Sequence, residues 1–156
     1  MRKPRILREG VCYHVSARAN RKELIFEKDE SKKLFLSVVR EAKGKYLFHI
    51  ENFCLMGNHF HFLVRPGPGE SLSKIMQWIL SVFASRFNRA HHLTGHVWGE
   101  RFFSRIIETM RAYLEQYTYI DANPCSAGLV ARVEDWLFGR FNLRSIGFED
   151  IITHPF

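Results

Sequence analysis

Two histidines separated by one residue are the part of this sequence best suited to chemistry. His59 and His61 stand in an apolar stretch, and side chains two positions apart in a strand lie on the same face, with Cα atoms roughly 6.5 Å apart. Phe60 and Phe62 then face the opposite side, towards a core. Neutral imidazoles bind metal ions at neutral pH, and two histidines are fewer than the four ligands of a closed structural zinc site. The pair therefore predicts an open, catalytic metal site; the alternative is two histidines on a half-exposed strand.

A tyrosine-rich segment follows later in the chain and is predicted to be helical. Tyr119 and Asn123 are four residues apart and share a helix face, with Gln116 one turn earlier. Tyr113 and Tyr117 share a different face and are expected to pack against a sheet. A tyrosine oxygen beside a metal-bound phosphate can act as a covalent nucleophile, and the Asn123 amide oxygen could add a metal ligand. The alternative is three tyrosines that serve only a core or its rim.

These residues need a scaffold, and the hydrophobic patterns predict four strands and three helices. The predicted strands cover residues 11–17, 47–56, 59–65 and 98–108, and the predicted helices cover 29–43, 71–88 and 110–123, the last ended by Asn123-Pro124. The order is that of a ferredoxin-like split βαβ fold. We expect an α+β protein whose antiparallel sheet carries helices on one face, plus an additional C-terminal helix with the tyrosine. The other sheet face stays open unless a second subunit or a substrate covers it.

Length and composition indicate one folding unit. A chain of 156 residues with 46% hydrophobic and 25% charged residues has the balance of a single globular domain, residues 1–156. Residues 1–9 form a basic arm, and 130–156 a tail of one short helix and a loop. No apolar run approaches the ~20 residues of a membrane helix, so we expect a cytoplasmic protein without a membrane partner. Cys12, Cys54 and Cys125 form no metal-binding pair and are expected to be buried, reduced thiols.

The net charge favours a partner with a phosphate backbone. Lysine and arginine number 23 against 16 acidic residues, a formal net charge of +7. Such an excess attracts nucleic acid, because neutralised phosphates release counterions. Basic proteins that bind nothing acidic also exist, so the charge needs support from particular residues.

The segment from Leu55 to Val64, L-M-G-N-H-F-H-F-L-V, resembles the L-M-x-N-H-x-H-x-L-V signature of the HUH single-tyrosine transposases. The chain as a whole resembles a REP-associated tyrosine transposase, because further blocks of that family occur in order: Tyr13-His14-Val15 followed by Arg18, residues 71–76, 87–89 and 95–98, Arg101-Phe102, and residues 119–124 and 127–130. The chain departs from the family where the pattern reads V-R after Asn-Pro. Ser126 stands at the arginine position, and a substrate contact from that arginine is not expected here.

The resemblance implies a reaction and its residues. His59 and His61, helped by Asn123, would bind Mg²⁺ or Mn²⁺, which would polarise a scissile phosphate in single-stranded DNA. Tyr119 would attack that phosphate and form a 5′-phosphotyrosine, leaving a free 3′-hydroxyl; reversal on a new strand needs no nucleotide cofactor. Substrates in the family are hairpins of repeated extragenic palindromes with a short single-stranded flank. A homodimer remains open, since the tyrosine could complete the site of its own chain or of a second copy.

The resemblance also gives the basic residues a role along single-stranded or hairpin DNA. The predicted phosphate contacts are Arg2, Lys3, Arg5 and Arg8 in the arm, Arg18 after the first strand, Arg89 at the end of the second helix, and Arg101 and Arg105 on the last strand. The alternative is that these cations only keep a phenylalanine-rich domain soluble. Trp98, Phe102 and Phe103 are expected in the core rather than as base-stacking platforms.

Two other functions compete with DNA strand transfer. A catalytically silent protein could keep the fold and bind DNA hairpins as a regulator, and a metal-dependent hydrolase could use the histidines with water as the nucleophile. The joint presence of His59, His61, Tyr119 and Asn123 favours an active transposase and endonuclease. No acidic residue flanks the histidines closely enough to suggest a general base, which disfavours the hydrolase.

Overall fold

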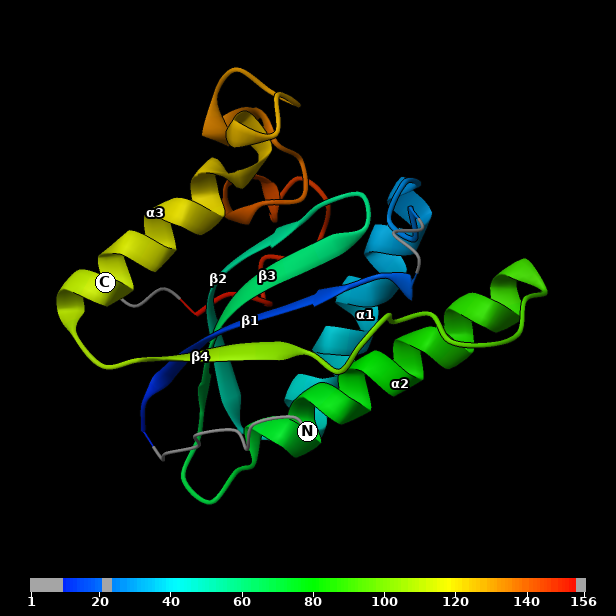
Figure 1. The fold of residues 1–156 in the computed structure, drawn as a ribbon, viewed down its shortest axis with the longest axis horizontal. Coiled ribbons are helices and arrows are strands. Elements are labelled where there is room, and N and C mark those ends of the chain that lie inside the picture. The colour runs from blue at the N-terminus through cyan, green and yellow to red at the C-terminus, as the bar shows by residue number, and fades with distance from the viewer. Residues whose placement is uncertain (1–9, 21–23, 154–156) are drawn as a thin grey trace.

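A four-stranded antiparallel sheet forms the centre of the computed structural model, which describes residues 10–20 and 24–153 (Figure 1). The strands lie in the order β2-β3-β1-β4, so that β2 and β4 are the edges. The elements are β1 (Cys12–Arg18), α1 (Asp29–Lys45), β2 (Phe48–Leu55), β3 (His59–Pro66), α2 (Leu72–His91), β4 (Phe103–Ile107) and α3 (Met110–Ser126). The predicted α+β fold with a ferredoxin-like element order is confirmed.

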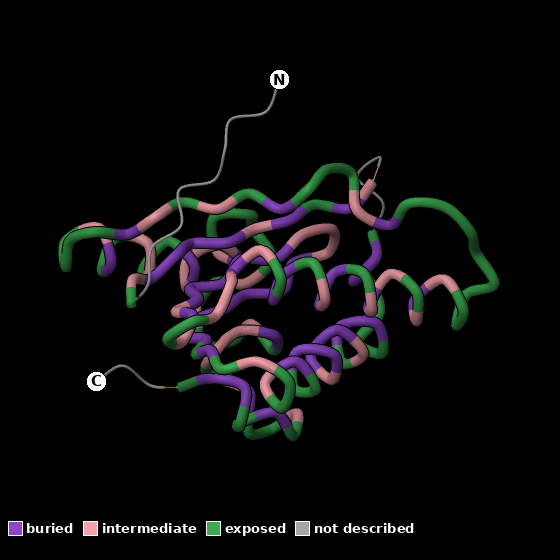
Figure 2. Tube along the Cα trace, turned by 90° about the horizontal axis from the view of Figure 1, so that it is seen from below, coloured by how far each residue is buried: buried purple, intermediate pink, exposed green. Residues whose placement is uncertain are grey.

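Phenylalanine side chains determine which face of the sheet packs on α1 and α2. Phe60 and Phe62 of β3 are fully buried on that face. The centre of the Phe35 ring of α1 lies 4.9 Å from that of Phe60 and 5.8 Å from that of Phe62. Figure 2 shows the buried residues along the central strands and the exposed ones on the outer turns. Because side chains alternate along a strand, burial of these rings sends His59 and His61 to the opposite face.

The opposite face of the sheet is covered in part by α3 of the same chain (Figure 1). Cys12, Leu63 and Ile107, from three different strands, pack with Tyr113 and Ile120 of this helix. The sequence left this face open to a second subunit or a substrate. In the structure the tyrosine helix and the histidine pair share it, because the apolar side of α3 needs a surface to bury against.

A β-bulge in β2 attaches α3 to the sheet. The register between β2 and β3 shifts just before Asn52, so that the neighbouring residues Glu51 and Asn52 both face α3. Glu51 accepts a hydrogen bond from the Tyr113 hydroxyl at 2.8 Å, and the Asn52 amide donates to the Tyr117 carbonyl oxygen at 3.0 Å. These two contacts hold the tyrosine helix along its first half.

The tail after α3 packs into the fold and differs from the predicted short helix and loop. It forms two 3₁₀ turns, Val133–Asp135 and Arg140–Asn142. Arg140 pairs with Asp121 of α3 at 2.8 Å, and Asp121 also accepts from the Asn52 amide at 3.1 Å. The tail also adds buried apolar side chains to the main core, namely Phe138, Leu143, Phe148, Ile151 and Ile152. It therefore stabilises both the sheet and the tyrosine helix.

Several predicted boundaries are wrong by a few residues. β4 begins at Phe103 instead of Trp98, because residues 98–102 run along α2 and contribute one isolated bridge, between Ala19 and Trp98. α3 continues through Pro124 to Ser126, since a proline in the last turn removes only one helical hydrogen bond. α1 passes the predicted stop at Gly44, and α2 extends to His91.

Two expectations drawn from composition can be compared with the structure. None of the helices in the described part of the chain has the length and apolar character that crossing a membrane requires. Cys12 and Cys54 are buried free thiols, as expected, whereas Cys125 is partly exposed. Burial raises the pKa of the Cys12 and Cys54 thiols to about 12, and thiols that stay protonated are poor nucleophiles.

Asn52→Ala is expected to lower the free energy of unfolding by about 1–3 kcal/mol. The Asn52 side-chain oxygen accepts a hydrogen bond from the buried Phe53 N–H at 2.8 Å, and the variant leaves this N–H without its acceptor. The variant also loses the two hydrogen bonds that the Asn52 amide donates to α3. Urea denaturation followed by circular dichroism measures the change. Thr118→Ala, at an exposed position of α3, should change stability by no more than about 0.5 kcal/mol. Equal stability of the two variants would show that the bulge does not depend on Asn52.

Candidate active site

His59 and His61 lie side by side on the face of the sheet that α3 shares. Their ring centres are 5.1 Å apart, with the ring planes nearly perpendicular. His61 is buried, with 9% of its surface exposed, and His59 is half-buried. The predicted common face of the two imidazoles is therefore confirmed.

Hydrogen bonds to the Nδ1 atoms determine the tautomers of both histidines. The His14 Nδ1 atom lies 2.6 Å from the Gln116 Oε1 atom; an amide oxygen only accepts, so His14 donates there and its Nε2 atom accepts. The His61 Nδ1–H donates to that Nε2 atom at 2.9 Å, and the His59 Nδ1–H donates to the Asn58 side-chain oxygen at 2.8 Å. The Nε2 atoms of His59 and His61 both keep a lone pair, as metal ligation requires.

The surroundings keep both imidazoles neutral. Burial, and then the positive charge of Arg18, lower the pKa of His59 to about 4. Burial, and then repulsion from His14, His59 and Arg18, lower the pKa of His61 to about 3. Burial also lowers the pKa of His14. At neutral pH these side chains are therefore uncharged and able to act as ligands or hydrogen-bond partners.

α3 brings Tyr119 and Asn123 to the histidines of the same chain. The Asn123 Nδ2 atom lies 3.3 Å from the His61 Nε2 atom. The Tyr119 ring centre is 5.6 Å from that of His61 and 5.9 Å from that of His14. Tyr119 is also 51% exposed, so a large substrate can reach it. The one-turn spacing of Tyr119 and Asn123 thus places both beside the predicted metal ligands.

The other two tyrosines of α3 have different surroundings. Tyr113 is buried and donates its hydroxyl hydrogen to Glu51; burial, and then the Glu51 carboxylate, raise the pKa of this hydroxyl. Burial likewise raises the pKa of Tyr117. A hydroxyl that resists deprotonation is a poor nucleophile. The distribution of burial along α3 therefore favours Tyr119.

A cavity of about 620 Å³ opens in front of the histidine pair. Arg18 and Arg101 line it together with His59 and His61. Phe103 also lines it and is 64% exposed; the expectation that this residue belongs to the core is wrong, because β4 is an edge strand and α3 does not cover its first residue. The cavity has two cations for phosphate and one aromatic ring.

The remaining predicted DNA contacts are less close to this cavity. Arg105 lies opposite His14 in the pairing of β1 with β4, on the face that α3 shares. Arg89 is exposed in the last turn of α2, on the helix that covers the other face (Figure 1). The arm with Arg2, Lys3, Arg5 and Arg8 lies outside the described residues.

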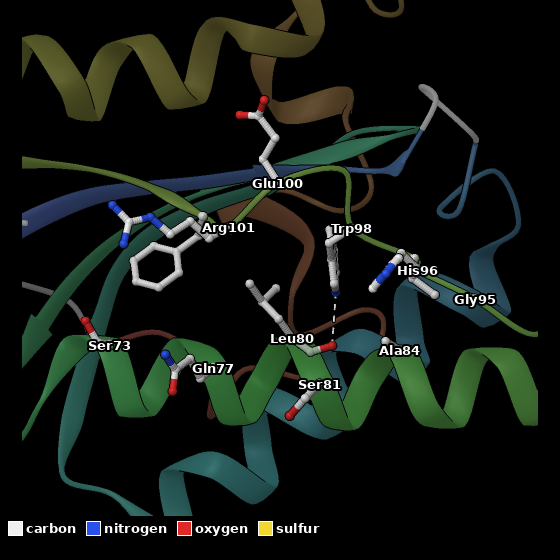
Figure 3. Close-up of a pocket in the computed structure, with 12 residues that line it drawn as sticks. Ser73, Gln77, Leu80, Ser81, Ala84, Gly95, His96, Trp98, Glu100 and Arg101 are labelled. Carbon is white, nitrogen blue, oxygen red and sulfur yellow. Dashed lines mark hydrogen bonds between the residues drawn. The ribbon is translucent and has the colours of Figure 1, made fainter. Parts of the chain in front are cut away.

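A second cavity, of about 890 Å³, lies between α2 and the segment 95–102 (Figure 3). The Trp98 indole N–H donates to the Leu80 carbonyl oxygen at 3.0 Å, and Phe102 is buried beside them, so Trp98 and Phe102 serve the packing as expected. Glu100 and Arg101 line both cavities, and Figure 3 shows the Glu100 carboxylate pointing away from α2. Only the smaller cavity contains the histidine pair, and we place the chemistry there.

Sequence reasoning missed His14 as a member of the site and found no acidic residue near the histidines. Glu100 lines their cavity, although it is far from them in sequence. A signal for His14 existed: Cys12, His14, Ser16 and Arg18 alternate on one face of β1, and this is the face of the histidine pair once β1 pairs with β3. The sequence alone does not show that β1 pairs with β3, so this signal could be used only once the strand order was known.

The donor set fits a divalent cation with open coordination positions. Within residues 10–20 and 24–153, no group of three or more His, Cys, Asp or Glu side chains is arranged to hold a metal. The candidate ligands are instead two imidazole nitrogens and the Asn123 amide. So few protein ligands would leave room on a bound ion for phosphate oxygens and water, which suits a site that binds a substrate.

Fold and site together define an α+β protein in which a tyrosine helix lies beside a histidine pair on the sheet. The family described as IS200-like transposase matches residues 8–123, and the chain belongs to this family. The resemblance drawn from the ordered sequence blocks is thereby confirmed at the level of the family. Among curated proteins, none matches the sequence significantly.

Two solved structures have a similar fold. The fold is similar to that of a REP-associated tyrosine transposase bound to a REP hairpin, with a TM-score of 0.77, 21% sequence identity, and coverage of 98% of this chain and 88% of the other. A protein of Deinococcus radiodurans, described as a candidate transposase, has a TM-score of 0.54 and 17% identity, with coverage of 76% of this chain and 95% of the other. The fold expected from the REP-associated resemblance is confirmed.

The low pKa values predict that acid destabilises the protein through its histidines. In the unfolded chain these groups titrate near 6.5, whereas folded His59 and His61 titrate near 4 and 3. The unfolded state binds more protons below pH 6.5, so the free energy of unfolding falls as the pH falls through this window. Urea denaturation with EDTA should show a decrease from pH 7 to pH 5, to which His61 contributes about 1–2 kcal/mol. The free energy of unfolding should fall less between pH 7 and pH 5 in His61→Gln than in the unmodified protein. An equal fall in both would show that His61 is not responsible for the acid sensitivity.

Proposed function

We propose that this protein cleaves and rejoins single-stranded DNA beside a hairpin through a 5′-phosphotyrosine on Tyr119. One observation carries the proposal: α3 places Tyr119 and Asn123 beside His61 of the same chain. Membership of a transposase family supports DNA cleavage as the activity.

The histidine pair and Asn123 would hold the metal ion. The donors would be the Nε2 lone pairs of His59 and His61 and, once the amide turns, the oxygen of Asn123, whose nitrogen faces the His61 Nε2 atom in the structure; Mg²⁺ or Mn²⁺ is the proposed ion. When bound, it supplies positive charge that stabilises the phosphate in the transition state. His14 would keep the His61 Nε2 lone pair available by accepting a hydrogen bond from the Nδ1–H of His61.

Tyr119 would perform the covalent step. Its oxygen forms a bond to the scissile phosphorus, and the bond from phosphorus to the 3′-oxygen of the preceding nucleotide breaks. The hydroxyl proton of Tyr119 is transferred through solvent to the departing 3′-oxygen. Because one phosphodiester replaces another, the step is reversible, and a 3′-hydroxyl can rejoin the strand without an energy source.

The substrate is proposed to be a DNA hairpin with an unpaired flank. The similar REP-associated transposase is bound to a REP hairpin, and Arg18 and Arg101 line the cavity in front of the histidines, where they could neutralise phosphates. We propose further phosphate contacts for Arg105, Arg89 and the basic arm. The nearness of Tyr119 to its own His61 supports action within one chain, and a homodimer stays a prediction.

An adduct assay tests the proposal. Purified protein with Mn²⁺ is mixed with a hairpin oligonucleotide carrying an unpaired flank and separate labels at the 5′ and 3′ ends. We expect a complex that survives SDS and carries only the 3′-end label, while the 5′-labelled fragment is released with a free 3′-hydroxyl. Tight binding without cleavage across many hairpins would support the silent regulator instead. Cleavage without an adduct would support the hydrolase.

A further inference from the structure

An exposed aromatic ring faces the candidate active site from the edge of the sheet. Phe103 is the first residue of β4, is 64% exposed and lines the cavity that contains the histidine pair. Single exposed apolar residues are common on protein surfaces. The strand register, however, places this ring beside the histidine pair.

Phe103 and His61 lie in one row across three strands. His61 of β3 pairs with Ser16 of β1, and Ser16 pairs with Phe103 of β4. Directly paired residues point to the same face, and two strand spacings separate His61 from Phe103 by roughly 10 Å. Serine is small, so the middle of the row is a hollow between the histidine and the aromatic ring, and Ser16 lines the cavity.

Two arginines beside this hollow suit the phosphate of one nucleotide in a single strand, and the Glu100 carboxylate also lines the cavity. Arg18 lies opposite His59 in the neighbouring row, and Arg101 precedes Phe103 by two residues; both line the cavity. Phosphate would lie towards these cations and the histidines, whereas the flat face of a base needs an apolar surface. A base inside a duplex has both faces covered by its neighbours, so only an unpaired base can stack on a protein ring.

We propose that Phe103 is the stacking platform for an unpaired DNA base next to the scissile phosphate. The proposal rests on the proposed function, since it assigns a place to the substrate of that site. Stacking on an aromatic side chain tolerates any base, so Phe103 contributes affinity and positioning for the flanking strand and does not read its sequence.

Binding of a hairpin with 2-aminopurine at single flank positions tests the platform. The measurement uses the Tyr119→Phe background, in which no cleavage alters the substrate. We expect the fluorescence of one flank position to be quenched on binding, and Phe103→Ala to remove that quenching and weaken binding of the flanked hairpin by about 5- to 100-fold. Phe103→Trp should restore both. Leu93→Ala removes a similarly exposed side chain, 52% exposed, that does not line the cavity, and should change neither.

The comparison with a blunt hairpin separates stacking from other roles. Phe103→Ala should bind a hairpin without a flank as tightly as its parent does. An equal loss on both DNAs, or no loss on either, overturns the proposal. So does a change from dimer to monomer with unchanged DNA binding, which would make this surface a protein interface. Quenching that depends on Phe103 in a protein that never cleaves DNA would retain the platform while rejecting the proposed reaction.

Discussion

Tyr119→Phe should eliminate the covalent protein–DNA adduct. The substitution removes only the attacking oxygen and leaves the ring beside His61 and His14, so the loss of cleavage should reach roughly 10⁴-fold or more, as for nucleophile removal in other enzymes. Binding of the hairpin should be nearly unchanged, because Tyr119 is half exposed and contributes little to the fold. SDS gel electrophoresis of end-labelled DNA measures the adduct, and fluorescence anisotropy measures binding.

The other tyrosines of α3 provide matched controls. Tyr113→Phe removes a buried hydrogen bond to Glu51 and should cost about 1–2 kcal/mol of stability, but the folded variant should still form the adduct. Tyr117→Phe should also retain it. An adduct that survives Tyr119→Phe and disappears in either of the other variants would show that the nucleophile is misassigned.

A mixture of two inactive variants tests whether the tyrosine acts on its own chain. Tyr119→Phe retains the histidines, and His61→Ala retains the tyrosine. Because Tyr119 lies beside His61 of the same chain, we expect the mixture to remain inactive. Recovery of the adduct on mixing would mean that the tyrosine serves a second subunit, as in the homodimer that the sequence leaves open.

The histidine strand was the most predictable part of the site. Alternation over His59, Phe60, His61 and Phe62 is a local property with a period of two, and burial of the phenylalanines is sufficient to determine the orientation of the histidines. The one-turn spacing of a tyrosine and an asparagine is equally local. Such features follow from the sequence without knowledge of the sheet order.

The parts that sequence reasoning missed depend on contacts between distant segments. His14 joins the site only because β1 lies between β3 and β4, and its partner Gln116 comes from α3. Glu51 and Asn52, which are neighbours, both face the tyrosine helix only because of a bulge, which has no distinct pattern in this sequence. Phe103 was expected in the core, but β4 is an edge strand whose first residue α3 does not cover, so this ring is 64% exposed. Which residues a neighbouring element covers is therefore decided by contacts that local patterns do not show.

His61→Ala should abolish metal-dependent cleavage and weaken Mn²⁺ binding by at least about 100-fold. The variant loses one of two imidazole ligands, and it leaves the His14 Nε2 atom and the Asn123 amide without the partner that each has in the structure. Isothermal titration calorimetry measures the affinity for Mn²⁺ independently of cleavage. His49→Ala is the matched control, because His49 is an exposed histidine on β2 that contacts Thr153; its affinity should equal that of the unmodified protein.

The His14 variant shows whether the metal ligand depends on its neighbour. His14→Ala retains both proposed ligands but removes the acceptor that holds the His61 proton on Nδ1, and loss of such a supporting partner typically costs 10- to 100-fold in metal affinity. We therefore expect the unmodified protein to bind Mn²⁺ most tightly, His14→Ala less tightly and His61→Ala least tightly. His61→Gln, which keeps most of the side-chain volume, separates loss of the ligand from loss of packing. If His61→Gln and His14→Ala both bind Mn²⁺ like the unmodified protein, the histidine pair is not the metal site, and the tyrosine chemistry must draw its positive charge from elsewhere.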